Sequence, residues 1–167
     1  DSHEITHMDA AHNQIIGSIA GLVPFVERDR VDRALVGSNQ QKQAVPLVKP
    51  ASPIVGTGLE GVVASNSGQI IYAEADGTVV KASAEEVVVE YAKNKKTYRP
   101  VHFVRSNEGT CINQRVVVSG GDKVKKGDAL IEGMSVQGGE LALGRDLVVA
   151  FMPWNGYNFE DAMVISR

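Results

Sequence analysis

The sequence predicts a mixed, mainly β fold in which helices are confined to the first 67 residues. Before residue 68, apolar residues recur at helical spacing. After it, short β-branched runs alternate with Gly, Asp and Asn turn signals. Seven short runs at this spacing are typical of a small barrel or sandwich. We therefore expect a barrel- or sandwich-like β unit over residues 68–145, inserted between segments 1–67 and 146–167, which belong to another core.

The first segment predicts helices followed by an extended connection. Helical spacing runs over residues 11–26 until Pro24 ends or kinks the helix. Asp29 and Asp32 are candidate caps of a second helix, which we expect to weaken at residues 37–38, before a polar, amide-rich stretch. Three prolines then predict an extended connection over 44–58, and a short helix fits residues 58–65.

The predicted strands are Gln69–Ala75, Thr78–Ala82, Val87–Tyr91, His102–Val104, Arg115–Val118, Ala129–Ile131 and Leu147–Met152. The basic run 93–96 is interpreted as a solvated hairpin tip. After Pro153 come an aromatic-rich loop over 154–159, the adjacent acids Glu160 and Asp161, and a last apolar run over 163–165. Two acids at a buried strand edge are costly without a cation opposite, so we expect a divalent metal or a partner's Arg or Lys there.

Composition restricts the function classes. A net charge of −3 is unusual for a free-standing nucleic-acid binder, so a nucleic-acid role requires local basic residues or a basic partner. The single cysteine, Cys111, excludes an internal disulfide and favours a reducing compartment. No apolar run approaches the roughly 18 residues of a membrane span, and no signal peptide is visible. We expect a cytoplasmic protein, and the first residue, Asp1, suggests a piece of a longer polypeptide.

Two motifs leave other functions open. His3 and His7 match H-E-x-x-H, the pattern of a zinc hydrolase, but no long helix surrounds them, and only Asp9 and His12 are nearby third ligands. The stretch 121–130, GDKVKKGDAL, looks like the turn of a barrel-sandwich hybrid, as in lipoyl and biotinyl carrier domains. It lacks the tetrapeptide that a modified lysine needs. A non-enzymatic binding or carrier module is therefore the alternative function.

Polar side chains around the second helix and the final acid pair are the candidate site residues. Arg33 can fork onto a phosphate. Asn39, Gln41 and Gln43 supply amides suited to sugar, phosphate or base edges. On pattern alone these residues are equally a polar helix end, and the acid pair is equally a surface or N-cap pair. The functional interpretation gives the acids a share in holding magnesium that also touches a nucleotide.

Two long stretches carry a resemblance to a known family. Residues 32–46, DRALVGSNQQKQAVP, and 149–166, VAFMPWNGYNFEDAMVIS, resemble the β subunit of bacterial-type multisubunit RNA polymerase. Shorter pieces agree in the same order: THMD at 6–9, IVGTGL at 54–59, RSNEGTCINQ at 105–114, KGDAL at 126–130 and GELALG at 139–144. The resemblance covers nearly the whole chain.

The resemblance implies that segments 1–67 and 146–167 are parts of a double-psi β-barrel at a DNA-templated RNA synthesis centre. It places Arg33 near the triphosphate, Asn39 and Gln43 near the nucleotide and RNA 3′ end, and Glu160 and Asp161 near the second Mg²⁺. The principal Mg²⁺ ligands, a triple-aspartate motif, belong to the β′ subunit and are absent here, so the isolated chain is expected to be inactive. Implied partners are the β′ and α subunits, the remaining β segments, sigma factor, DNA template, RNA and nucleoside triphosphates, with no membrane, in the cytoplasm or the plastid stroma.

Overall fold

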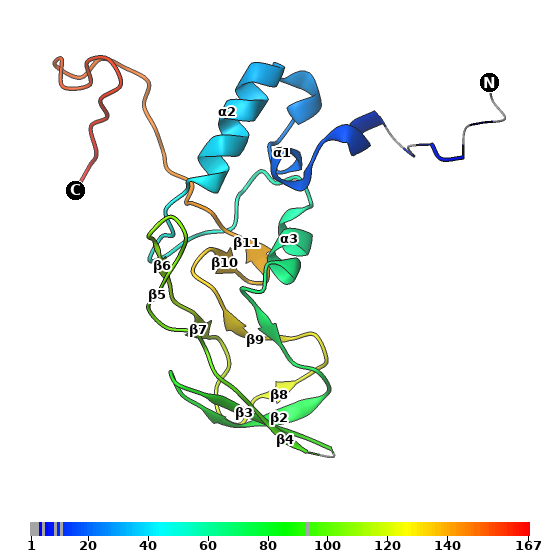
Figure 1. Cartoon of the computed structure of the whole chain (residues 1–167). Helices are drawn as coiled ribbons and strands as arrows, with labels where there is room; N and C mark the ends of the chain where they lie inside the picture. Colours follow the sequence, from blue (N-terminus) through cyan, green and yellow to red (C-terminus); the bar gives the residue numbers. More distant parts are fainter. Residues whose placement is uncertain (1–3, 5, 9, 11, 93) are drawn as a thin grey trace.

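The first helices and the four-stranded sheet occupy opposite ends of the molecule, a third helix packs on a short hairpin between them, and the last residues run past the first helices without regular structure (Figure 1). The computed structural model describes residues 4, 6–8, 10, 12–92 and 94–167. Its helices are η1 (His12–Ile15), α1 (Ser18–Gly21), η2 (Val26–Arg28), α2 (Val31–Lys42) and α3 (Glu60–Asn66). Its strands are β1 (Ile71–Tyr72), β2 (Gly77–Ala82), β3 (Val87–Tyr91), β4 (Lys95–Tyr98), β5 (Val104–Arg105), β6 (Cys111–Ile112), β7 (Arg115–Val116), β8 (Lys123–Val124), β9 (Ala129–Glu132), β10 (Val136–Gln137) and β11 (Glu140–Leu141).

The single helix predicted over residues 11–26 is wrong, because three short pieces, η1, α1 and η2, stand in its place. Gly17 is extended, with φ −69° and ψ 166°, and Phe25 is left-handed, with φ 59°. Gly21 allows a close approach, since a Cβ there would lie 3.0 Å from Cδ1 of Leu59. Glycines have low helix propensity, so the apolar spacing alone does not sustain a long helix.

Helix α2 continues through the point where we expected it to weaken. Its inner face consists of Ala34, Gly37, Ser38 and Gln41, at spacings of three and four residues, and this face meets α1 and the turn after it. A Cβ on Gly37 would lie 3.8 Å from Val23, and the Ser38 hydroxyl donates to the carbonyl of Ala34 at 2.7 Å. Tertiary packing thus outweighs propensity here. The predicted caps are wrong as well, because the N-cap is Arg30 and no side chain caps the helix.

The strands form antiparallel sheets that do not close into a barrel. A four-stranded sheet has the order β4-β3-β2-β8, a three-stranded sheet has the order β1-β9-β7, and β10-β11 and β5-β6 form two-stranded pairs. The mixed, mainly β class is confirmed. The predicted hairpin tip at 93–96 is wrong for its second half, because β4 begins at Lys95 and pairs with β3 along four residues.

Two apolar clusters form the core, and every member of either cluster lies between Ala64 and Val136. The larger cluster joins the inner faces of the two main sheets and contains Ala73, Val79, Val87, Val89, Tyr91, Tyr98, Val124, Leu130 and Ile131. The smaller one joins α3 to the β10-β11 hairpin and contains Ala64, Ile70 and Val136. In the stretch 121–130, Val124 and Leu130 point inward, with exposures of 5% and 0%. The β unit therefore has its own core.

The C-terminal segment (residues 146–167) has no helix or strand, so the strands predicted at 147–152 and 163–165 are wrong. Its apolar side chains face outward: Phe151 is 99% exposed and Ile165 86%. A strand requires a partner edge for its backbone groups, and none of the described strands pairs with this segment. No helix in the described part of the chain has the length and apolar character needed to span a membrane.

Candidate functional site

Arg33 lies on the outer side of α2 with its guanidinium in solvent. The neighbouring charges are already paired, because Arg30 Nη2 contacts Asp32 Oδ2 at 2.9 Å. Within the part of the chain that the structure describes, no acid forms an ion pair with Arg33. An exposed guanidinium without a partner keeps its donors available for an anionic ligand.

Asn39 and Gln43 form one polar surface with Gln40 at the C-terminal end of α2. Asn39 and Gln43 are four residues apart and therefore neighbours on the helix surface. All three side chains are exposed, on the side of the helix turned away from α1. Arg33 and Gln40 are two turns apart on the same side. The predicted substrate-binding residues are therefore all exposed, with Arg33 on the side of Gln40 and with Asn39 and Gln43 further round the surface at the C-terminal end of α2.

The acid pair lies at the end of a tight loop in the C-terminal segment. Asn158 organises the loop: its Oδ1 accepts the Trp154 amide at 2.9 Å, and its Nδ2 donates to the Met152 carbonyl at 2.7 Å. Glu160 has a left-handed backbone with φ 55°. Glu160 and Asp161 are fully exposed, so the expected burial at a strand edge is wrong. The loop carries the acids but does not bury them.

The structure does not bring the acid pair and Arg33 into contact. No hydrogen bond or ion pair among the described residues joins α2 to residues 147–167, and the segment diverges from α2 in Figure 1. The described part of the chain also holds no group of three or more His, Cys, Asp or Glu that could bind a metal. Carboxylate oxygens suit Mg²⁺, but two adjacent acids fill only part of its octahedral shell. Glu160 and Asp161 therefore fit a shared metal and not a complete site.

The zinc motif receives no support from the described residues. His3 lies outside them, and His7 is exposed, with its Nδ1 2.8 Å from the Thr6 hydroxyl. At the carrier-like turn, the acids accept backbone amides: Asp128 binds the Lys125 amide and Asp76 the Lys126 amide, both at 2.8 Å. These contacts give the turn a structural role, and the carrier alternative is not favoured.

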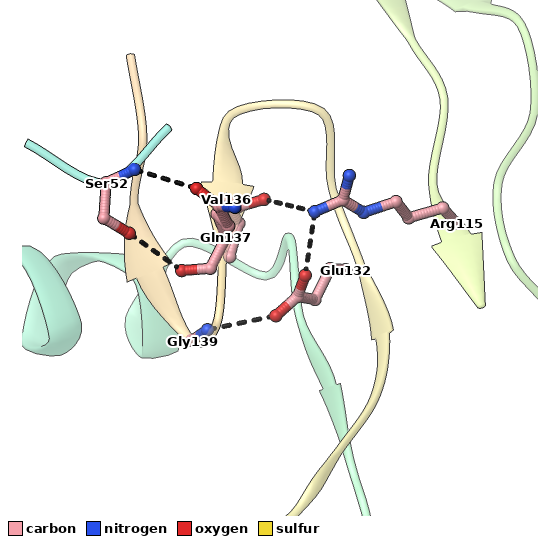
Figure 2. A network of polar contacts seen from close by, with 6 residues as sticks. All are labelled: Ser52, Arg115, Glu132, Val136, Gln137 and Gly139. Carbon is pink, nitrogen blue, oxygen red and sulfur yellow. Dashed lines mark hydrogen bonds and ion pairs between the residues drawn. The ribbon is translucent and has the colours of Figure 1, made fainter. Parts of the chain in front are cut away.

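Sequence patterns did not single out a polar network that ties the β10-β11 hairpin to the sheet (Figure 2). Glu132 is buried, with 5% of its side chain exposed, and its Oε2 contacts Arg115 Nη2 at 3.2 Å. Its Oε1 accepts the Gly139 amide at 3.0 Å, and Arg115 also donates to the Val136 carbonyl at 3.2 Å. The partners are far apart in sequence. The one local signal is a Glu inside an apolar strand, ALIE.

A second buried acid, Glu60, organises the loop before α3. Its carboxylate accepts the amides of Thr57 at 2.7 Å and Gly58 at 2.8 Å, and also the Thr57 hydroxyl. The Thr57 amide, more than any other group, lowers the pKa of Glu60 below its usual value, against the opposing effect of burial. The acid is ionised at neutral pH and holds the loop that leads from α2 toward the β unit.

Comparison with known proteins identifies the family. The sequence model of the family RNA polymerase Rpb2, domain 6, matches residues 72–167, more than half of the chain. The chain therefore belongs to this family. It is also similar over its whole length to proteins named DNA-directed RNA polymerase subunit beta: 53% identical to that of Chlamydia felis, 52% to that of Chlamydia trachomatis serovar L2 and 49% to that of Protochlamydia amoebophila. The chain spans 14% of the length of each of these relatives. The resemblance to a bacterial-type β subunit is confirmed.

Proposed function

We propose that this chain serves, within a complete β subunit, in DNA-directed RNA synthesis by nucleotidyl transfer. The observation that carries the proposal is its similarity along its entire length to bacterial β subunits at about half identity. The two stretches with the candidate residues both fall inside this match. The exposed apolar surface of residues 146–167 agrees with a segment that is covered by other parts of a larger assembly.

We propose that segments 1–67 and 146–167 contribute to a double-psi β-barrel and that residues 68–145 are an inserted unit. The inserted unit supplies every buried member of the larger apolar cluster, and the flanking segments contribute only Ala64, to the smaller cluster. Partners of the assembled enzyme are the β′ and α subunits, the remaining β segments and sigma factor, acting on DNA, RNA and nucleoside triphosphates in the cytoplasm. The plastid stroma is the corresponding location if the source is a plastid.

In this proposal, Arg33 binds the triphosphate of the incoming nucleotide and neutralises charge that develops during transfer. Asn39 and Gln43 contact the nucleotide and the RNA 3′ end through their amides. Glu160 and Asp161 hold, together with ligands of the β′ subunit, the Mg²⁺ that accompanies the triphosphate, and that ion supplies charge neutralisation. Each of these side chains is exposed and without an ionic partner in the described chain, as a group reserved for a ligand must be.

The test is single-nucleotide addition on a primed scaffold by an assembled polymerase carrying Arg33→Ala. We expect the KM for the nucleoside triphosphate to rise and kcat to fall, with a combined loss on the order of 10²-fold. Arg30→Ala is the matched control, because Arg30 lies three residues away and is bound to Asp32, and it should behave like the wild type. Equal kinetics of the Arg33→Ala variant and the wild type would contradict the proposed role. The isolated chain should show no turnover.

A further inference from the structure

The segments that carry the proposed site residues cross at one point. The Ala51 amide, downstream of α2, donates to the Gly144 carbonyl at 2.9 Å and forms an isolated antiparallel bridge. The Ile54 amide donates to Asp146 Oδ2 at 3.2 Å. The chain thus enters and leaves the β unit side by side, so the orientation of this crossing affects both α2 and the C-terminal segment.

The crossing is attached to the β10-β11 hairpin by Gln137 (Figure 2). The Ser52 amide donates to Gln137 Oε1 at 2.9 Å, and the Ser52 hydroxyl donates to the Gln137 carbonyl at 3.2 Å. These contacts span 85 residues of sequence. Gln137 is exposed, so its side chain contributes little to the core. Its contact with Ser52 holds the hairpin against the segment that enters the β unit.

The hairpin is in turn fixed to the sheet by the Arg115–Glu132 pair. Glu132 reaches the hairpin at Gly139, and Arg115 reaches it at Val136. Val136 is fully buried against α3, so the two charged side chains set the position of the hairpin on both of its strands. Glu132 is buried and Arg115 is half-exposed. An ion pair with a buried member is weak evidence for stability, and its better-attested role is to specify one arrangement.

Apolar packing does not fix the crossing against α2. A pocket of about 270 Å³, open to solvent, lies between the α1–α2 pair and the crossing, lined by Leu22, Gln41, Pro53 and Leu143 among others. Interiors without voids transmit position through close packing, and here that packing is incomplete. The polar contacts of Ser52, Gln137, Arg115 and Glu132 hold the crossing on the β unit, and the short chain of residues 43–50 joins the crossing to α2.

We propose that Arg115, Glu132 and Gln137 are positioning residues, which set the placement of Arg33 relative to Glu160 and Asp161 through the crossing at residues 51–54 and 144–146. The inference rests on the proposed function. It adds that residues of the inserted unit, which contact no substrate, influence nucleotide and metal use. Small displacements of reacting groups have large effects on rate.

The sharpest test uses Gln137 in the assembled polymerase, because this exposed residue can be replaced without opening the core. Gln137→Ala removes the acceptor of the Ser52 amide, whereas Gln137→Glu retains an oxygen there. We expect Gln137→Ala to raise the Mg²⁺ concentration needed for half-maximal nucleotide addition by roughly threefold to tenfold. This effect is smaller than the roughly hundredfold loss of rate that a misplacement of about 1 Å can cause. Gln137→Glu should match the wild type. Equal Mg²⁺ dependence of all three proteins would overturn the inference.

A second pair of variants separates positioning from folding. Arg115→Ala should raise both the Mg²⁺ requirement and the KM for nucleotide, and Arg115→Lys should restore part of each. Glu86→Gln is the control, because Glu86 pairs with Lys81 on the surface of the same unit. A purely structural role would lower the fraction of active enzyme, measured by burst amplitude, without changing either constant, and that result would contradict the inference. If Arg33→Ala has its expected effect while these variants do not, the proposed function stands and the positioning role falls.

Discussion

Leu130→Ala should destabilise the β unit by about 3–4 kcal/mol. Leu130 is 0% exposed in β9, the central strand of the three-stranded sheet, and its carbonyl accepts the Val117 amide at 3.1 Å. Loss of the isopropyl group removes roughly 2.4 kcal/mol of transfer free energy at about 0.8 kcal/mol per carbon. Because strands on both sides hold the backbone, the cavity cannot collapse fully, and this adds about 1 kcal/mol.

The assay is urea unfolding followed by far-UV circular dichroism. Fluorescence of the single tryptophan would not report on the core, since Trp154 lies in the C-terminal segment and is 52% exposed. Phe151→Ala is the matched control, because Phe151 is large, apolar and 99% exposed, and it should change the free energy of unfolding by less than about 0.5 kcal/mol. A loss below about 1 kcal/mol for Leu130→Ala, or equal losses for both variants, would refute the reasoning that the β unit holds the core.

Three further predictions concern titrating groups. Because the pKa of Glu60 is lowered in the folded state, its contribution to stability should be complete above its unfolded pKa and disappear as the pH falls through its folded pKa. In urea unfolding between about pH 3 and 6, Glu60→Gln should therefore reduce the dependence of stability on pH. The pKa of His102 is raised because Asn113 and a backbone carbonyl accept hydrogen bonds from its ring. Its contribution to stability should be complete below about pH 6.5 and disappear as the pH rises through the folded pKa. NMR titration should show a lower pKa for His102 in the Asn113→Ala variant. Burial and a hydrogen bond with Tyr91 raise the pKa of Tyr98. The ultraviolet titrations of the wild type and a Tyr98→Phe variant should therefore differ only as the chain unfolds, and a difference near pH 10 in the folded chain would contradict this.

Alternation and turn chemistry predicted three of the strands almost to the residue. The run Val87–Tyr91 has the same bounds in the structure as in the prediction, and β2 and β9 differ from theirs by one residue at one end. Burial in β3 follows the two-residue period, whereas Leu130, Ile131 and Glu132 of β9 are buried in succession. Local pattern sufficed because β2 and β3 form a hairpin whose register follows from the short turn between them.

The errors share a physical cause, which is tertiary context. The run 93–96 reads as a charged hairpin tip, but β4 begins at Lys95. Tyr98, which ends this strand, is buried with its hydroxyl bonded to Tyr91 at 2.8 Å, and the Lys96 ammonium pairs with Glu74. The run 147–152 reads as a strand but has no edge to join in this chain. The β propensity of a segment gives only a tendency, and the neighbouring segments determine whether a strand forms.

The candidate site was likewise predictable only where its residues lie close together in the sequence. Motif resemblance suggested Arg33, Glu160 and Asp161 as site residues because it acts on contiguous stretches, and their role stays a prediction. It missed the contact between Ser52 and Gln137, since two residues 85 positions apart leave no local pattern. It also could not show that α2 and the acid pair do not meet within this chain. The relative placement of these segments depends on a crossing that only the structure reveals.

The Mg²⁺ dependence of nucleotide addition tests the central claim most directly. An assembled polymerase that carries both Glu160→Ala and Asp161→Ala should add nucleotides more slowly and require more Mg²⁺, by on the order of tenfold or more, because the ion on the triphosphate loses two carboxylates. Both residues are exposed, so the substitutions should leave the β unit folded, with an unchanged urea midpoint. A Mg²⁺ titration identical to that of the wild type would contradict the assignment of this chain to the nucleotide side of the polymerising centre.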